Sequence, residues 1–207
     1  CIVKNINMLQ HRKVNIGSGK LHIQIIKKIR VNLANMLLAA MLFTNISNAV
    51  YAKPASDSQV KAAFVYNFTK FIDWPSNAFK DESSPIVIGI LGDDNFACTL
   101  NETVKDKVVG GRKIAIKQSA RVRDMEDCHI VYIGVNNESH LGKVLEDVGS
   151  KYTLTVSDIE RFARRGGIIG FTDEDDKVGF EINLKRAKNA NLEISSKLLK
   201  LAKIIDG

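Results

Sequence analysis

The residues best suited to chemistry are Cys98, Cys128 and His129, which follows Cys128 directly. A cysteine and a histidine in contact can form a catalytic pair or share a metal ion. Side chains adjacent in a strand point to opposite faces of the sheet, so Cys128 and His129 are not expected to act together. The sequence has no second cluster of cysteines and histidines that would complete a zinc site. We therefore expect neither a metal nor a cofactor here.

The acidic residues also fall short of a recognisable site. Asp93 and Asp94 end an apolar run, as in a phosphoacceptor domain, but residues 132–136 lack the further aspartate that such a site needs. A turn or a helix cap is the favoured role for this pair. The run of Asp173, Asp175 and Asp176 lacks the glycine and the final glutamate of a calcium loop, which favours a solvated hairpin tip. With no phosphate-binding glycine loop and no Gly-x-Ser-x-Gly motif, we expect a protein that is not an enzyme.

Residues 1–52 have the features of a secretory signal peptide with an upstream extension. Basic residues 27–30 precede the apolar run 36–43, and small residues allow cleavage after Ala52 or after Ala49. The alternative is a retained membrane anchor, but the run has about eight residues, whereas a span needs about 20. We expect export to the periplasm with removal of residues 1–52, leaving one domain at 53–207.

Charge follows the same division of the chain. Seven of the 30 Lys and Arg residues lie within residues 1–52, and none of the 23 Asp and Glu residues does, so the formal charge of +7 belongs to that segment. The part from Lys53 onward is neutral overall. A neutral domain has no net field to attract nucleic acid or an anionic membrane.

Two cysteines remain after residue 53, and in an exported protein an even pair is first interpreted as a disulfide. A Cys98–Cys128 bond would contribute about 3–4 kcal/mol in the chain-entropy model. The alternative is two separately buried thiols.

The aromatic stretch 59–75 is expected to form the central helix of the core. Its large apolar residues recur every three to four positions, at Val60, Phe64, Phe68 and Phe71. Ser56 and Gln59 fit a capping box, and Pro75 disfavours helical geometry at Trp74, where the helix should end.

The rest of the domain alternates between strands and helices. Strands are expected at 85–91, 112–117, 128–134, 152–156, 168–171 and 178–184. Helices are expected at 95–109, 137–148 and 157–165, and after Ser196, where Leu198, Leu199, Ala202 and Ile205 share one side. This order predicts an α/β fold: a single-domain three-layer αβα sandwich with a mainly parallel sheet and a C-terminal antiparallel hairpin.

The segment KAAFVYNFTKFIDWP at 61–75 resembles the opening signature of the YfiR-like family of bacterial periplasmic proteins. The resemblance continues in the same order through nearly all of the domain, at 90–94, 128–133, 154–158, 166–169, 180–184 and 192–202. It implies a dimeric regulator that holds an inner-membrane diguanylate cyclase inactive by binding its periplasmic domain, and so limits cyclic di-GMP signalling and biofilm formation. It also implies an outer-membrane lipoprotein that can sequester the repressor.

The resemblance bears on the cysteines as well. The family has disulfides that report the redox state of the periplasm, and Cys98 and Cys128 look like one such pair. A second family pair has no counterpart, because no cysteine follows Cys128. That difference argues against a redox switch more than against a structural bridge.

Two functions are compatible with these features: a protein-binding repressor of a membrane cyclase, or a periplasmic small-ligand-binding protein that feeds a sensor or a transporter. Glycines at the strand ends (Gly89, Gly92, Gly134, Gly166 and Gly167) could form a cleft for the second function. For partner binding, the candidates are Trp74 and Phe79 at the exit of the aromatic helix, and Lys197 and Lys200 on the terminal helix. Core packing is the expected role of most apolar residues in these segments.

Overall fold

The computed structural model describes residues 55–149, 151–174 and 177–205, which belong to a unit spanning 54–207. The expected signal peptide at 1–52 lies outside the described residues. Helices of this part are α2 (Asp57–Phe71), α3 (Asp94–Val104), α4 (Leu141–Val148), α5 (Leu184–Asn189) and α6 (Ser196–Leu199). Short 3-10 helices are η2 (Ser76–Ala78), η3 (Val122–Met125) and η4 (Val135–His140).

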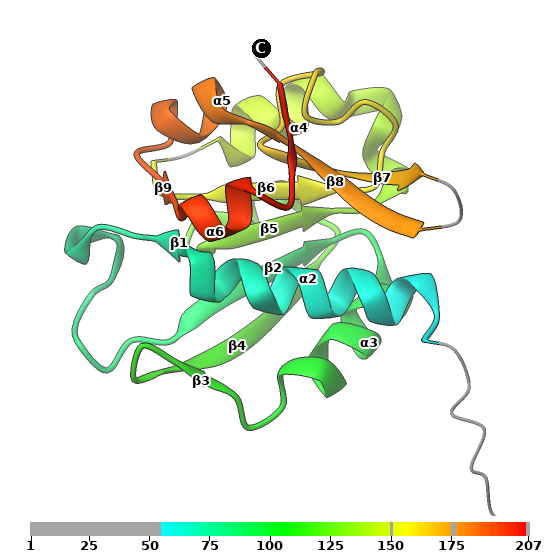
Figure 1. Ribbon diagram of the computed structural model, residues 1–207. Coiled ribbons are helices and arrows are strands. Elements are labelled where there is room, and N and C mark those ends of the chain that lie inside the picture. The colour runs from blue at the N-terminus through cyan, green and yellow to red at the C-terminus, as the bar shows by residue number, and fades with distance from the viewer. Residues whose placement is uncertain (1–54, 150, 175–176, 206–207) are drawn as a thin grey trace, which may run out of the picture. The chain divides into compact units, whose positions relative to one another are not determined.

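Most strands of the described part join one sheet (Figure 1). They are β2 (Ile86–Leu91), β3 (Val108–Val109), β4 (Arg112–Ser119), β5 (Ile130–Ile133), β6 (Leu154–Ser157), β7 (Ile169–Glu174), β8 (Lys177–Asn183) and β10 (Lys203–Ile205). Two further strands, β1 (Ile72–Asp73) and β9 (Glu193–Ile194), pair with each other.

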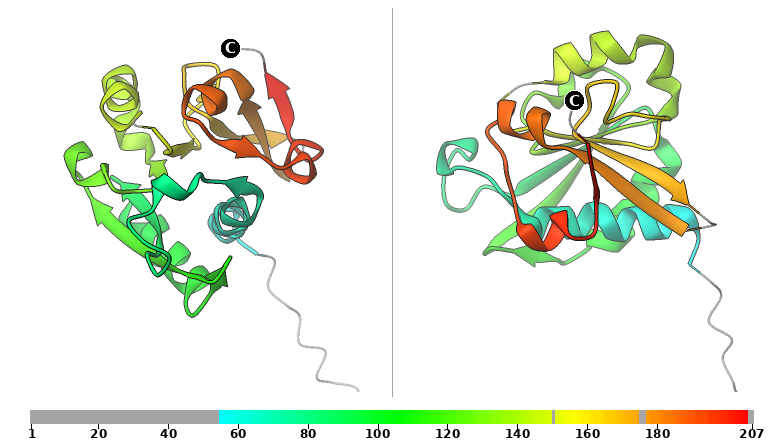
Figure 2. Two further views of the ribbon diagram at one scale, coloured as in Figure 1. Left: turned by 90° about the vertical axis from the view of Figure 1, so that its left-hand side faces the viewer. Right: turned by 45° about the horizontal axis from the view of Figure 1, so that its top comes forward.

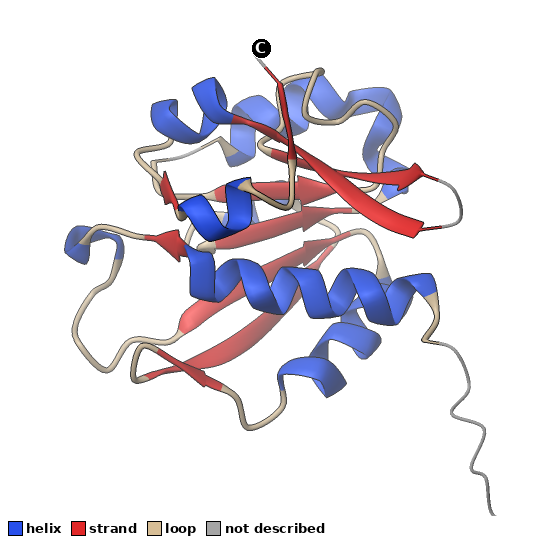
Figure 3. Ribbon diagram, viewed as in Figure 1, coloured by secondary structure: helices blue, strands red, loops and turns tan. Residues whose placement is uncertain are grey.

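The sheet has the order β10-β8-β7-β6-β5-β2-β4-β3. The strands β4, β2, β5, β6 and β7 are mutually parallel, and β7 and β8 form an antiparallel hairpin. The α/β sandwich with a mainly parallel sheet and a C-terminal antiparallel hairpin is thereby confirmed (Figure 3).

Alternation along the central strands separates two apolar layers. Ile88 and Ile90 of β2 face a cluster that includes α2 and α3, whereas Leu91 faces a second cluster that includes α4 and η3. Figure 2 shows α2 and α4 on opposite sides of the sheet. Strands covered on both faces need apolar residues at consecutive positions, which explains the unbroken apolar runs in the sequence.

Helix α2 begins as the sequence predicts, with a capping box. The Ser56 hydroxyl accepts a hydrogen bond from the Gln59 N–H, and the Gln59 side chain accepts one from the Ser56 N–H at 2.9 Å. Phe68 is fully buried, and its ring centroid lies 6.1 Å from that of Phe171 and 5.4 Å from that of Phe180. The first helix is therefore joined to the β7–β8 hairpin by ring packing.

Two helix ends differ from expectation. Helix α2 stops at Phe71 and not at Trp74, because Ile72 and Asp73 form β1 and pair with Ile194 and Glu193 of β9. The helix expected at 95–109 stops at Val104, since residues 108–109 pair with the start of β4 as β3. In both cases strand pairing shortens the helix.

The helix expected at 157–165 is wrong. Figure 3 draws this segment mainly as a loop, and it is a series of turns. The Ser157 hydroxyl donates to the Ile133 carbonyl at 2.6 Å and accepts from the Ile159 N–H, so it caps no helix with Glu160. Arg161 has φ of 56°, in the left-handed region, which ends any right-handed helix there.

The long terminal helix is also wrong. Helix α6 ends at Leu199, and residues 203–205 form β10, which pairs in parallel with β8. Ile205 is buried through this strand, whereas Leu201 and Ile204 are 68% and 40% exposed. Of the expected inner face, Leu198 is buried in the core that surrounds α2.

We predict that Phe68→Ala lowers the free energy of unfolding by about 3–5 kcal/mol, because it removes a fully buried ring between α2 and the hairpin. Urea unfolding followed by circular dichroism measures this change. Lys70→Ala on the exposed side of α2 is the control and should change stability by less than about 1 kcal/mol. A Phe68→Ala protein as stable as the control would contradict this account of the core.

Candidate functional site

The chain leaving α2 forms a loop over the amino ends of the parallel strands, at the left of Figure 1. This segment, residues 74–85, is here named the exit segment. It is held by His129, which lies just before β5. The Val87 N–H donates to Nδ1 of His129 at 3.1 Å. Because that ring nitrogen accepts, the proton lies on Nε2, which donates to the Ala78 carbonyl at 3.2 Å. One neutral imidazole thus ties the exit segment to the sheet.

Aromatic contacts support the same connection. The Phe79 ring stacks on the His129 ring, with 4.4 Å between the centroids. The Arg112 guanidinium also lies over the Phe79 ring, 3.8 Å from its centroid. Trp74 meets His129 edge-on at 6.1 Å, and its Nε1 donates to the Tyr152 carbonyl at 2.9 Å. Trp74 and Phe79, two of the predicted partner-binding residues, therefore anchor the exit segment.

Arg112 closes the far end of the exit segment. Its guanidinium donates to the carbonyls of Asp81, Glu82 and Ser84 at 2.7–2.9 Å. Carbonyls that converge on one cation fix the path of the chain where a loop would otherwise have few partners.

Burial sets the ionisation state of His129. Its pKa is lowered from the ordinary value of 6.5, mainly because the side chain is only 7% exposed and the charged form loses hydration. The hydrogen bond to Ala78 raises the pKa, and the nearby Arg112 lowers it. The neutral ring required by the Val87 bond is the form that burial favours.

A cavity of about 460 Å³, here named the His129 cavity, lies beneath the exit segment. It is lined by residues 77–80, 84–85, 87, 117, 126–129 and 151–153. Cys128 and His129 both line it, because they precede β5 and so are not held to the strict alternation expected of a strand. Burial raises the pKa of the Cys128 thiol to about 11, so this cysteine is a protonated, unreactive side chain.

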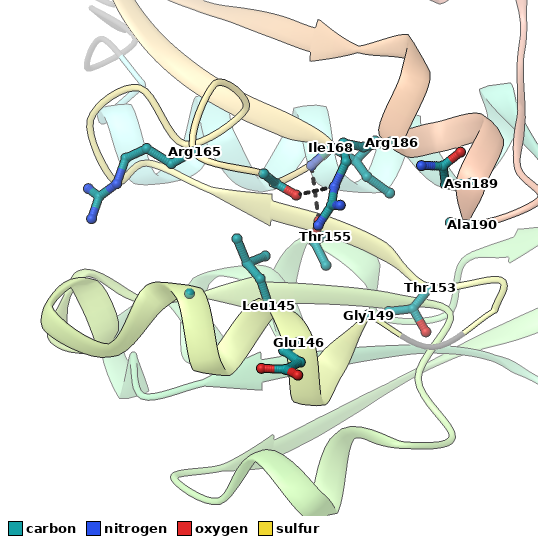
Figure 4. A pocket seen from close by; sticks show the side chains of 12 residues that line it. Leu145, Glu146, Gly149, Thr153, Thr155, Arg165, Ile168, Arg186, Asn189 and Ala190 are labelled. Atoms are coloured by element: carbon teal, nitrogen blue, oxygen red, sulfur yellow. Dashed lines mark hydrogen bonds between the residues drawn. The ribbon is translucent and has the colours of Figure 1, made fainter. Parts of the chain in front are cut away.

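A second cavity, of about 370 Å³, lies between α4, α5 and β6 (Figure 4). Its two arginines are already bound to protein acceptors. Arg186 Nε donates to the Gly166 carbonyl at 2.7 Å, and Arg165 pairs with Glu138 at 2.8 Å. Figure 4 shows Arg165 pointing away from the other lining residues.

The structure does not join the two cysteines. Both are free thiols, Cys98 exposed on α3 and Cys128 only 3% exposed. Helix α3 turns Phe96, Ala97 and Leu100 toward the sheet, so Cys98 faces away from it. Cys128 belongs to the cluster on the opposite face, with α4. The sequence interval allowed a bridge, but the rotation of α3 and the intervening sheet separate the two sulfur atoms.

The acidic residues take the structural roles that their surroundings predict. Asp93 caps α3, accepting from the Phe96 N–H at 3.0 Å. Asp173 is exposed near the tip of the β7–β8 hairpin, while Asp175 and Asp176 lie outside the described residues. Among the described residues no group of three or more His, Cys, Asp or Glu is placed to hold a metal ion.

The cleft expected at the strand carboxyl ends is bridged by asparagines. Strands β2 and β5 are neighbours whose connections leave in opposite directions, which is where open α/β sheets bind ligands. Here the Asn136 side chain donates to the Gly92 carbonyl at 3.0 Å, and that of Asn137 donates to the Leu91 carbonyl at 3.1 Å. The protein's own amides thus occupy the position between these two strand ends.

Lys197 and Lys200, the other predicted partner-binding residues, are exposed around α6. The β1–β9 pairing separates them from the exit segment. Because the Ser195 N–H bonds to the Phe71 carbonyl, α6 lies beside the end of α2, while Trp74 continues in the opposite direction. The four predicted residues therefore form two surfaces. Leu201, which directly follows Lys200, is also exposed.

Sequence reasoning missed the residues that organise the exit segment, namely His129, Arg112 and Tyr152. A histidine directly before the apolar run of β5 and an arginine at the start of β4 were the available signals. Neither signal shows which residues the side chain contacts, because the contacts join distant parts of the chain. Phe79, for example, is about 50 residues from His129 in sequence.

Comparison with known proteins adds the family. A model of the YfiR/HmsC-like family matches residues 58–203, which include nearly all residues of the helices and strands described above. The chain belongs to the YfiR/HmsC-like family. Members of this family are periplasmic regulators, and membership suggests a regulator of a diguanylate cyclase.

A crystal structure of a conserved domain protein from Vibrio cholerae O1 biovar eltor str. N16961 is similar to this YfiR/HmsC-like chain at 11% identity, with a TM-score of 0.47. The alignment covers 73% of this chain and 60% of that protein, so the chain spans somewhat more than half of its length. No curated protein matches. In the residues that the structure describes, no helix is both long and apolar enough to cross a membrane.

We predict that acid weakens this YfiR/HmsC-like domain through His129. A folded pKa below the unfolded value of about 6.5 means that the unfolded chain binds more protons, so stability is fully present above about pH 6.5 and is lost as the pH falls toward the folded pKa. Between about pH 7.5 and 5, His129→Gln should lose less in melting temperature than the wild type, because it lacks the group whose pKa is lowered by folding. His140→Gln, an exposed substitution, is the control. Parallel pH profiles for wild type and His129→Gln would refute the prediction.

We also predict unequal thiols. With Ellman's reagent under native conditions, the exposed Cys98 should react at least about 100-fold faster than Cys128, which is buried and has a raised pKa. Cys98→Ser should abolish the fast phase, and Cys128→Ser should leave it intact. The bonded alternative predicts no reactive thiol and a joined Cys98–Cys128 peptide in a non-reducing map.

Proposed function

We propose that this protein is an exported periplasmic repressor that binds the periplasmic domain of an inner-membrane diguanylate cyclase and holds the cyclase inactive. The observation that carries the proposal is the family match across residues 58–203. Export by a cleaved signal peptide at 1–52 is part of the proposal and rests on the composition of that segment. Lowered cyclic di-GMP and reduced biofilm formation are its expected consequences in the cell.

The bridged strand ends support a binding protein over an enzyme. In open α/β enzymes, the crevice between diverging strands receives the substrate. In this protein the side-chain amides of Asn136 and Asn137 donate hydrogen bonds to the carbonyls of Gly92 and Leu91, respectively. A surface for another protein needs no such crevice.

The surface around α6 and β10 is the better candidate for the cyclase contact. Leu201 and Ile204 are two of three large apolar side chains exposed in the described residues, and Leu201 directly follows Lys200 in the sequence. Apolar residues surrounded by charged ones are typical of protein interfaces. Trp74 and Phe79 are half-buried and engaged with His129, so we assign them the role of shaping the exit segment.

Two further partners belong to the proposal through the family resemblance. One is a second copy of this chain in a homodimer, and the other is an outer-membrane lipoprotein that sequesters the repressor. Both remain predictions, and size-exclusion chromatography with light scattering measures the first.

The second candidate function is a small-ligand-binding protein that feeds a sensor or a transporter. The observation in its favour is the pair of cavities of about 370 and 460 Å³, volumes at the lower end of the range for small-molecule sites. Neither lies at the bridged ends of β2 and β5, where the sequence suggested a cleft.

We predict that deleting the gene raises cellular cyclic di-GMP and biofilm mass, and that the tagged protein captures a diguanylate cyclase through its periplasmic domain. Nucleotide extracted from cells and quantified by mass spectrometry measures the first effect. Unchanged cyclic di-GMP together with no captured cyclase would end the proposal.

We predict that Leu201→Ser combined with Lys200→Glu weakens binding of the captured cyclase domain by about tenfold or more, because it removes an apolar anchor and reverses a neighbouring charge. Lys143→Glu, an exposed reversal on α4, is the control and should leave affinity within about twofold. Equal loss in both variants would indicate general electrostatic attraction and would remove α6 and β10 as the contact surface.

A further inference from the structure

Three lysines line the His129 cavity, together with two carboxylates. Lys80 reaches it from the exit segment, Lys117 from β4, and Lys151 from the turn before β6. In the described part of the chain, none of these three ammonium groups makes a hydrogen bond or an ion pair. Lys117 is half-buried, whereas Lys80 and Lys151 are exposed, and together the three charges favour an anion at this cavity.

The carboxylates of the cavity are fewer than its lysines. Glu126 and Asp127 belong to a single turn before β5, whereas the lysines come from three separate segments. Neither carboxylate lies within ion-pair distance of a lysine in the described residues. The lining therefore carries a small cationic excess, three lysines against two carboxylates.

One wall of the cavity is apolar and firmly held. The Phe79 ring is fixed between His129 and Arg112, and Pro85 and Val87 continue the same wall. A wall that is already ordered costs a ligand little conformational entropy on binding. The lining thus offers cations for one end of a small molecule and an ordered apolar surface for the other.

The second cavity, between α4, α5 and β6, does not combine unpaired cations with an ordered apolar wall. Its arginines donate to the Gly166 carbonyl and pair with Glu138, so an entering anion would compete with existing partners. The contrast identifies the His129 cavity as the better anion site.

We propose that the His129 cavity binds a small organic anion, a carboxylate or phosphate attached to an apolar body. Lys117 and Lys151 hold the anionic group, and the wall formed by Phe79 contacts the body. This site is separate from the α6–β10 surface, and it does not depend on the identity of the protein partner. It adds ligand binding to a protein whose proposed role is to bind another protein.

Trp74 provides a direct readout. It is the only tryptophan in the chain, and it lies edge-on to His129 with its Nε1 bonded to Tyr152, a cavity residue. Filling the cavity should therefore change the tryptophan fluorescence of the purified, processed protein. Isothermal titration calorimetry measures the same binding independently.

The probe is phenyl phosphate, compared with inorganic phosphate and with benzyl alcohol, each of which carries half of the proposed chemistry. We expect phenyl phosphate to bind at least tenfold more tightly than either, and more weakly as salt is added. Lys117→Gln and Lys151→Gln should each weaken it about tenfold, and Lys117→Arg should restore most of the affinity. Lys113→Gln, on the same strand but outside the cavity, is the matched control.

The outcomes separate cleanly. Loss of binding in Lys117→Gln and Lys151→Gln, with normal melting temperatures and an unaffected Lys113→Gln, supports the site. The proposal is overturned by any of three results: no binding of phenyl phosphate at about 10 mM, equal binding of inorganic phosphate, or equal weakening by Lys113→Gln. Capture of the cyclase is scored separately, so failure here leaves the proposed repressor role standing.

Discussion

The packing of the Phe68 ring against Phe171 and Phe180 is the contact on which the rest of the structure depends. It holds the first helix, α2, on the sheet through the hairpin formed by β7 and β8, about 100 residues later in the chain. The ion pair between Lys61 and Asp158, at 2.7 Å, fixes the same helix near its start. Once α2 is placed, the position at which the chain leaves it is determined, and so is the origin of the exit segment.

The exit segment connects this core to the candidate site. Its path depends on three anchors: the neutral ring of His129, the guanidinium of Arg112 and the indole of Trp74. One of these anchors, His129, also lines the His129 cavity. Rigid helix and strand packing thus positions a cavity whose lining comes from segments far apart in sequence, as is common for binding sites on α/β scaffolds.

Local patterns in the sequence predicted what local interactions determine. The capping box of Ser56 and Gln59 and the unbroken apolar runs of β2 and β5 depend on neighbours within a few residues or on general burial.

The predictions from sequence were wrong where contacts between distant residues determine the structure. Ile205 has helical spacing with Leu198, yet pairing with β8 gives the backbone of this segment a strand partner. Ser157 could cap a helix, but its hydroxyl bonds to Ile133 instead. Whether Cys98 can reach Cys128 depends on the rotation of α3 about its axis, and the sequence interval between the two cysteines does not give that rotation. The cavity was unpredictable for the same reason, since no pattern links Lys117 to Lys151.

The order of the elements along the chain has a consequence for synthesis. Among the described elements, the helix in the centre of the core is made before the others, and the strand with Phe180 is made near the end. A chain that stops before Phe180 lacks one of the rings that pack on Phe68 and leaves that side of Phe68 uncovered. Incomplete chains therefore expose aromatic surface that proteases and chaperones recognise, and only a complete chain escapes them. The aromatic helix in this way makes full-length synthesis a condition for survival of the product.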